Sequence, residues 1–219
     1  CGETHRCGGG FSSAAERGSG LQIDVYDGGI RDADCGIGEN MKIAVLCVGN
    51  RLMLDDGAGP AVYDELKERY LLPENVTLFD AGCMSMDLLP VVRDCDFVIA
   101  VDAVDVPDAK PGTVYRFAPD EIGGHGIMQS LHDLRLIDLI QAATLLGYEC
   151  DGMCFGVQVE NMSPVTLTEG LTPDVFAALP LLVDCVLAQL MDLGVEVRNA
   201  DGTVFVPPTE KENVEGAPC

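Results

Sequence analysis

The sequence predicts a three-layer α/β sandwich in which a mostly parallel, twisted sheet is flanked by helices. Apolar runs of strand length alternate with segments of helical period across residues 41–198. These runs are continuously apolar, which is typical of parallel strands that are covered on both faces. The chain has 219 residues, of which 47% are hydrophobic, enough for one sizeable core.

The first strand is expected over residues 42–48, KIAVLCV, before a turn that reads GNRLMLDDGAG. Pro60 should occupy the first turn of the next helix, because its fixed φ and missing N–H suit that position. Val62, Leu66 and Tyr70 then recur along one face of this helix. The stretch therefore predicts a strand, a turn and a helix in succession.

The later elements follow the same alternation. Strands are expected over residues 76–82, 96–104, 112–118 and 154–160, and helices over residues 86–94, 132–147 and 173–194. The stretch 112–118 alternates like an edge strand. Gly147 and Gly194 should end their helices. Pro180 should bend the last helix or lie within its first turns.

Two segments fall outside this domain. Residues 1–40 are rich in Gly and Ser without a sustained period, so we expect a flexible N-terminal extension. Residues 199–219 should form a polar C-terminal tail with one strand-like piece. No apolar run approaches the ~20 residues of a membrane span, and the N-terminus lacks an apolar signal segment. We therefore expect a cytoplasmic protein with no membrane insertion.

The charge balance limits the choice of partners. The formal net charge is −23, with 36 acidic residues against 13 basic ones. Such a surface repels a phosphate backbone, and no cluster of Lys and Arg offsets it. Nucleic acid is therefore not expected as a partner.

The ten cysteines do not indicate a disulfide framework. A domain with a full core needs no such bridges, and free Cys behaves as a small apolar residue. Four of them lie in or beside apolar segments: Cys47, Cys95, Cys154 and Cys185. Cys150 also pairs with Cys154 in the sequence CDGMC, but no second pair lies at zinc-site spacing. A metal role for CDGMC is therefore the less favoured alternative.

Carboxylates follow the ends of several expected strands, where ligands bind in sheets of this kind. The candidates are Asp55 and Asp56 after the first strand, Asp80, Asp102 and Glu160 at later strand ends, and His132 at a helix start. One imidazole with two or more carboxylates suits a divalent cation such as Zn, Ni or Mn. Three protein ligands would leave open positions for substrate or water. Taken alone, Asp55 is better explained as a turn former or helix cap, Asp80 fits a turn equally well, and His132 fits the start of a helix without any ligand.

The adjacent Asp55 and Asp56 carry like charges. They need water, a cation or separate directions in which to point. The choice among these bears directly on function.

Two other classes of protein fit poorly. A dinucleotide site needs G-x-G-x-x-G at the first helix, but Cys47 stands at the first glycine and the turn is too long. No G-x-S-x-G elbow marks a serine hydrolase. The only histidines are His5, His125 and His132, so a Ser or Cys hydrolase is hard to build. A nucleotide-binding module and such a hydrolase are therefore disfavoured.

The stretch MKIAVLCVGNRLMLDDGAGPAVYDEL resembles the N-terminal signature of the hydrogenase maturation proteases, nickel-dependent endopeptidases that process [NiFe] hydrogenase large subunits. The similarity continues in family order through VTLFDAGCMSMDLLP, DFVIAVDAVDVPDAKPGTVYRF, SLHDLRLIDLIQAATLLG and GVQVENMSPVTLTEGLTPDV. It covers about residues 41–197.

The resemblance implies an enzyme that removes the C-terminal extension of a [NiFe] hydrogenase large-subunit precursor once nickel is inserted. It implies that Asp56, Asp102 and His132 contact this nickel, which the precursor supplies. The nickel would polarise the carbonyl or activate water, with a carboxylate as general base. Both routes stay open, and no residue is nominated as the nucleophile. The residues expected to support these ligands or to line the substrate rim are Asn50, Asp55, Asp80 and Glu160.

The chain departs from the family pattern in its first turn and at the end of its second strand. Cys47 stands where many members have glycine, and Cys83 where threonine is common; we interpret Cys83 as structural. Asp56 is shorter than the Glu of some members, which reduces its reach to a metal. The alternative function from another class is a non-catalytic metal- or peptide-sensing maturation chaperone on the same fold.

Overall fold

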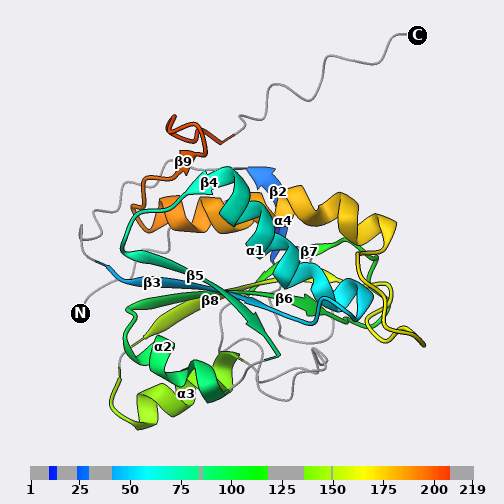
Figure 1. Cartoon of the computed structure of the whole chain (residues 1–219), viewed down its shortest axis with the longest axis horizontal. Coiled ribbons are helices and arrows are strands. Elements are labelled where there is room, and N and C mark those ends of the chain that lie inside the picture. The colour runs from blue at the N-terminus through cyan, green and yellow to red at the C-terminus, as the bar shows by residue number, and fades with distance from the viewer. Residues whose placement is uncertain are drawn as a thin grey trace.

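A seven-stranded sheet forms the centre of the computed structural model, which describes residues 10–13, 24–29, 41–83, 86–117, 136–148 and 150–207 (Figure 1). The strand order is β1-β2-β7-β8-β6-β3-β5. The strands are β1 (Gly10–Ser13), β2 (Asp24–Gly29), β3 (Ile43–Val48), β5 (Val76–Gly82), β6 (Phe97–Val104), β7 (Val114–Phe117) and β8 (Asp151–Gln158).

Four of these strands run parallel. β3 pairs in parallel with β5 and β6, and β6 pairs in parallel with β8. β7 is antiparallel to β8, so the predicted mostly parallel sheet is confirmed. Because the carboxyl ends of parallel strands meet at one edge of a sheet, the ends of β3, β5, β6 and β8 form a common rim.

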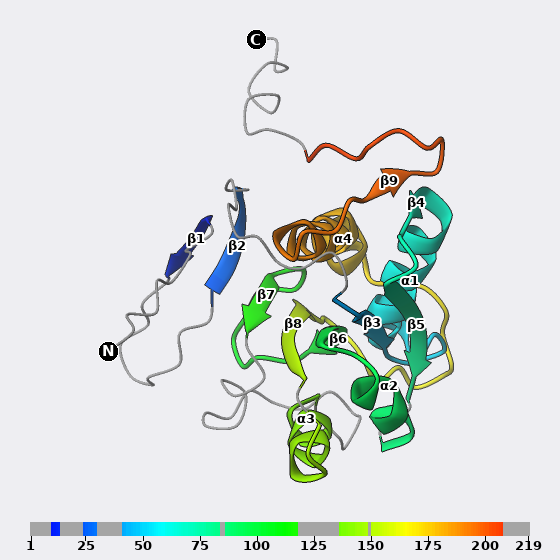
Figure 2. The same cartoon turned by 90° about the vertical axis from the view of Figure 1, so that its left-hand side faces the viewer.

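Helices cover both faces of the sheet. α1 (Ala58–Arg69) and α4 (Pro173–Asp192) lie on one face, and α2 (Leu89–Arg93) and α3 (Leu136–Leu145) lie on the other (Figures 1 and 2). β3 alternates between the two cores: Val45 packs in the core with α1 and α4, and Leu46 packs in the core with α2 and α3. Its continuous apolar run is therefore buried on both sides, and the predicted three layers are confirmed.

Two helices show how well the predicted bounds hold. α4 ends at Asp192, and Gly194 follows two residues later with a φ of 79° and an N–H that donates to Met191 O at 2.9 Å. Pro180 lies inside α4. α3 is described from Leu136 on, so the first residues of the predicted helix 132–147 lie outside the described residues.

The segments next to the predicted domain also contain strands. β2 is antiparallel to β7, and β1 is antiparallel to β2. In the chain after α4, β9 (Arg198–Asn199) pairs with β4 (Tyr70–Leu71), and the Phe205 ring meets the Tyr70 ring edge-on at 5.4 Å. Composition did not indicate β1 and β2, because backbone pairing at a sheet edge needs no apolar period. The boundaries at residues 40 and 198 stay predictions.

Helix α4 combines length with apolar character. Among the described residues it is the one helix whose length and hydropathy would allow it to cross a membrane. Half of the window that meets this test is buried inside the protein. Its buried face packs against β8 and α1, as in the core helix of a globular domain.

Two glycines let the chain pass closely from β3 to α1. A Cβ at Gly49, which has a φ of 136°, would lie 1.9 Å from Asp56 O. A Cβ at Gly59 would lie 2.0 Å from Val48 O and 2.9 Å from Val101 O. The start of α1 therefore packs directly on the backbones of β3 and β6, which fixes the intervening turn at the rim.

Replacing Gly59 with Ala should destabilise the protein by at least about 3 kcal/mol, because the clashing atoms belong to the backbone of buried strands. Gly57→Ala is the matched control, since its nearest atom would be Arg51 Cα at 3.4 Å. We expect the control to stay within about 1 kcal/mol of the wild type in urea unfolding. Equal stability of the two variants would contradict this packing.

Candidate active site at the carboxyl rim

The turn between β3 and α1 buries both adjacent aspartates. It contains a 3-10 helix, Leu54–Gly57, and Asp55 and Asp56 are 0% and 1% exposed within it. Their side chains make hydrogen bonds to different parts of the protein. Separate directions are one of the three ways in which two like charges can lie side by side.

Asp55 binds the loop after β8 and the start of α4. Its Oδ2 accepts hydrogen bonds from the N–H groups of Glu160 at 3.0 Å and Asn161 at 2.8 Å, and from Thr172 Oγ1 at 2.9 Å. Its Oδ1 accepts from the N–H of Thr172 at 2.7 Å. Thr172 precedes the first turn of α4, where the helix dipole favours a negative charge. Asp55 therefore has a structural role and fastens three segments together.

Asp56 turns back toward the end of β3. Its Oδ2 accepts a hydrogen bond from the N–H of Asn50 at 3.0 Å. Asn50 Oδ1 accepts from the N–H of Leu52 at 3.0 Å, so this side chain holds the turn that carries Asp56. Asn50 therefore supports a predicted ligand through the backbone.

Asp102 lies on β6, next to the end of β3. It is half-buried, and its Oδ1 accepts a hydrogen bond from the N–H of Ala103 at 2.8 Å. The preceding residue, Val101, pairs with Cys47 of β3. Asp102 therefore lies beside the carboxyl end of β3, where the turn that holds Asp56 begins. β6 continues to Val104, two residues beyond Asp102, so this carboxylate lies within the strand.

Cys83 lies at the carboxyl end of β5, within electrostatic range of both carboxylates. It follows Gly82, the last residue of β5, whose C=O accepts a hydrogen bond from the N–H of Gly49 at 2.9 Å. Burial raises the pKa of the Cys83 thiol, and the nearby charges of Asp56 and Asp102 raise it further. Residues from β5, β6 and the turn after β3 thus come together at one part of the rim.

Asp80 is paired with an arginine that the sequence reasoning did not single out. Arg51 Nη2 donates to Asp80 Oδ2 at 2.8 Å and to Asp64 Oδ1 at 3.1 Å. Hydrogen bonds to Asp64 and Asp80 raise the pKa of the Arg51 guanidinium. This side chain thereby ties the turn to β5 and α1. Arg51 precedes both aspartates in the sequence, by 13 and 29 residues, so no local pattern signalled the pairing and only the fold brings the three together.

The remaining predicted residues have different positions. The side chain of Glu160 is exposed, and its backbone N–H is the part that contacts Asp55. His132 belongs to residues 118–135, outside the described residues. Within the described part of the chain, no group of three His, Cys, Asp or Glu side chains is arranged to hold a metal ion. The full ligand set of Asp56, Asp102 and His132 stays a prediction.

The CDGMC cysteines lie elsewhere in the sheet. Cys154 is buried on β8, and burial raises the pKa of its thiol. Burial likewise raises the pKa of Cys150 to about 12. Within the described residues, neither thiol belongs to a group of three His, Cys, Asp or Glu side chains that could hold a metal ion.

Fold and rim together define an α/β protein with a carboxylate site at the carboxyl ends of its parallel strands. The family model described as "Hydrogenase maturation protease" matches residues 60–189, a range that includes Asp102 and His132. The hydrogenase 2 maturation protease of Escherichia coli K12 is 34% identical over 158 residues, covering 71% of this chain and 94% of the relative. The chain belongs to the hydrogenase maturation protease family and is an endopeptidase.

Solved structures agree with this assignment. The hydrogenase maturating endopeptidase HybD from Escherichia coli matches with a TM-score of 0.65 and 32% identity, covering 74% of this chain and 99% of HybD. The [NiFe] hydrogenase maturation protease HybD from Thermococcus kodakarensis matches with a TM-score of 0.54 and 22% identity, covering 68% of this chain and 99% of that protein. The second match shows the shared fold.

Asp55→Asn should reduce the free energy of unfolding by about 2–4 kcal/mol, because an amide N–H₂ would face buried donors in place of an acceptor oxygen. Asp64→Asn is the matched control on the surface, where loss of an exposed ion pair should change stability by less than about 1 kcal/mol. Urea unfolding measures both values. A loss of less than about 1 kcal/mol in the free energy of unfolding of Asp55→Asn would contradict the structural role of its hydrogen bonds.

Asp102→Asn should speed alkylation of Cys83 by iodoacetamide at about pH 8.5. Asp102 raises the pKa of this thiol, so removing its negative charge lowers the pKa and increases the reactive thiolate fraction. Peptide mass spectrometry follows Cys83 alone. Asp94→Asn is the control, because Asp94 raises the pKa of Cys95 instead. An unchanged alkylation rate of Cys83 in Asp102→Asn would contradict the influence of the Asp102 charge on this thiol.

Proposed function

We propose that this endopeptidase removes the C-terminal extension of a [NiFe] hydrogenase large-subunit precursor after nickel has been inserted. The observation that carries the proposal is that β3 and β6 are neighbours, which brings Asp56, in the turn after β3, and Asp102, on β6, to the same rim. Two carboxylates that approach from separate elements form an oxygen-donor site where parallel sheets bind their ligands. Membership of the family and the names of the relatives, which are hydrogenase maturation proteases, support the same substrate class.

The nickel in this proposal is part of the substrate. Asp56, Asp102 and His132 would contact nickel that the precursor's own ligands already hold. Two carboxylates and an imidazole suit a borderline divalent cation. Three protein donors leave coordination positions open, which suits contact with an ion that the precursor's ligands also hold.

Contact with the nickel would fix the scissile peptide bond at the rim. The nickel supplies a Lewis acid, and a carboxylate of the rim serves as general base for water, or orients the ion that polarises the carbonyl. Cys83 is a poor nucleophile, because burial and two carboxylates raise its pKa and keep it protonated near neutral pH. We assign no nucleophile.

The proposal puts the reaction in the cytoplasm. All six cysteines that the structure describes are free thiols, which suits a reducing compartment. The net charge of −23 directs recognition toward a protein partner and away from nucleic acid.

Incubation with a nickel-loaded large-subunit precursor should release its C-terminal peptide, and the nickel-free precursor should stay intact. Mass spectrometry of the precursor follows the cleavage. Asp56→Ala, Asp102→Ala and His132→Ala should each lower the rate by at least about 100-fold, because each removes a contact to the ion that positions the scissile bond.

Glu68→Ala, an exposed change on α1, is the control and should cleave at the wild-type rate. Cleavage of both precursor forms at equal rates would refute nickel recognition. Tight binding without any mass change, from a precursor that a known protease can process, would favour the chaperone alternative.

A further inference from the structure

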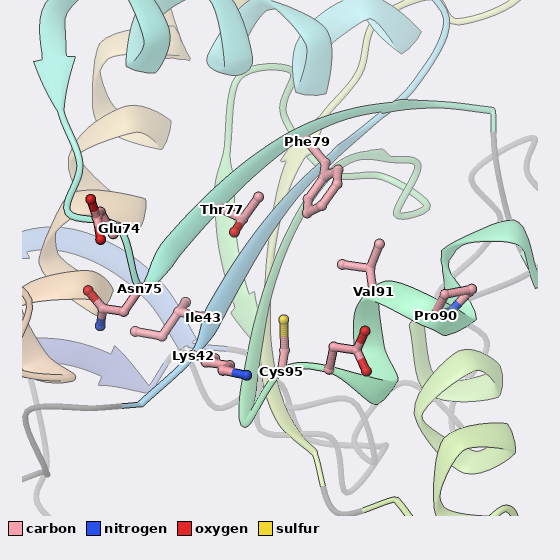
Figure 3. A pocket seen from close by; sticks show the side chains of 10 residues that line it. Lys42, Ile43, Glu74, Asn75, Thr77, Phe79, Pro90, Val91 and Cys95 are labelled. Atoms are coloured by element: carbon pink, nitrogen blue, oxygen red, sulfur yellow. The ribbon is translucent and has the colours of Figure 1, made fainter.

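An open groove lies between β5 and α2, away from the acidic rim (Figure 3). Its volume is about 630 Å³. Thr77 and Phe79 of β5 form one side, and Pro90 and Val91 of α2 form the other, with Lys42 at the amino end of the sheet. The walls are thus mixed: apolar side chains face each other along β5 and α2, and the charged residues Lys42, Glu74 and Asp94 also line the groove.

The strand beside this groove has an open edge. Among the described strands, β5 pairs only with β3, so it ends the sheet. The N–H of Ile43 donates to Asn75 O at 2.9 Å, and ladder bonds alternate along a strand. By this alternation the N–H and C=O groups of Leu78 and Asp80 point away from β3, toward the outside of the sheet.

The sequence of β5 does little to block pairing at this edge. The strand reads VTLFDAG and contains no Pro, Lys or Arg, the residues with which proteins commonly protect an exposed edge. It is seven residues long, which spans about 23 Å of extended chain. An edge of this length and apolar character is a template for another extended segment.

β5 also connects the groove with the candidate active site. Its amino end begins just after Asn75, which lines the groove. Its carboxyl end leads to Cys83, and the neighbouring strand β3 leads into the turn that holds Asp56. A peptide held along this edge would therefore have one end at the rim and the other near Lys42.

We propose that the C-terminal extension of the precursor binds as an added strand, antiparallel to β5, with every second side chain in the groove. The direction follows from the chemistry: the scissile bond lies at the rim, so the extension runs from Cys83 toward Lys42. This inference rests on the proposed function, since it names how the same site holds its substrate.

The groove indicates which extensions fit. Phe79, Pro90 and Val91 favour aliphatic side chains at the positions that face α2. Lys42, Glu74 and Asp94 line the groove together, so its charged part favours polar side chains and not an acidic one alone. Backbone hydrogen bonds to Leu78 and Asp80 would supply affinity that does not depend on sequence.

Hydrogen–deuterium exchange of the full-length enzyme tests the added strand directly. The probe is a synthetic peptide with the extension of the organism's [NiFe] large-subunit precursor, and it needs neither nickel nor cleavage. We expect exchange of the Leu78 and Asp80 amides to slow by at least about tenfold when the peptide is bound. N-methylation of the alternate peptide amides that face β5 should weaken binding by about tenfold, and N-methylation of the other set should not.

A variant pair tests the groove. Thr77→Arg places a long side chain in the groove from an exposed position and should raise KM for the peptide's parent precursor by about tenfold, with kcat unchanged. Thr144→Arg makes the same change on the exposed surface of α3 and should leave KM unchanged.

The outcomes separate this inference from the proposed function. Cleavage of the nickel-loaded precursor with no protection of β5, or with equal effects of both N-methylated sets, would overturn the added strand while the protease function stands. Protection of β5 without cleavage would support the strand and refute the proposed function. Protection that depends on enzyme concentration and not on peptide would assign the edge to a second copy of the chain and overturn the inference.

Discussion

The buried carboxylate of Asp55 holds together the three segments that form the candidate active site. Its donors come from the loop after β8 and from Thr172 at the start of α4, while Asp55 itself belongs to the turn after β3. Because the group is 0% exposed, losing it would leave several donors unsatisfied in the interior. The two adjacent aspartates therefore have separate roles: Asp55 holds the three segments in place, and Asp56 lies at the rim in the turn that they support.

Packing of the sheet gives this frame its position. β3 is buried on both faces, and the start of α1 lies so close to β3 and β6 that Gly59 has no room for a side chain. The turn between them is thus constrained from both ends. Asp56 and Asp102 can reach a common ligand only because β3 and β6 are neighbours in the sheet, and β5 brings Cys83 to the same rim from the other side of β3.

The sequence predicted the features that depend on local pattern. Continuous apolar runs indicated the parallel strands, and strand ends followed by carboxylates indicated the rim. The partners of Asp55 could not be predicted, because Thr172 is 117 residues away and most of the donors are backbone N–H groups, which carry no sequence signal. The same holds for the bridge from Arg51 to Asp80, and for β1 and β2, which join the sheet through backbone pairing. The place of His132 in the ligand set stays a prediction from the family resemblance.

The central claim is that the rim contacts nickel while the precursor still holds it. X-ray absorption at the nickel edge, recorded on the loaded precursor with and without the enzyme, tests this claim most directly. The account predicts that nickel keeps the ligands that the precursor provides and gains oxygen or nitrogen neighbours in the complex, and that this gain is lost with Asp102→Ala. An unchanged nickel spectrum in a stable complex, or transfer of the nickel from the precursor to the enzyme, would contradict it.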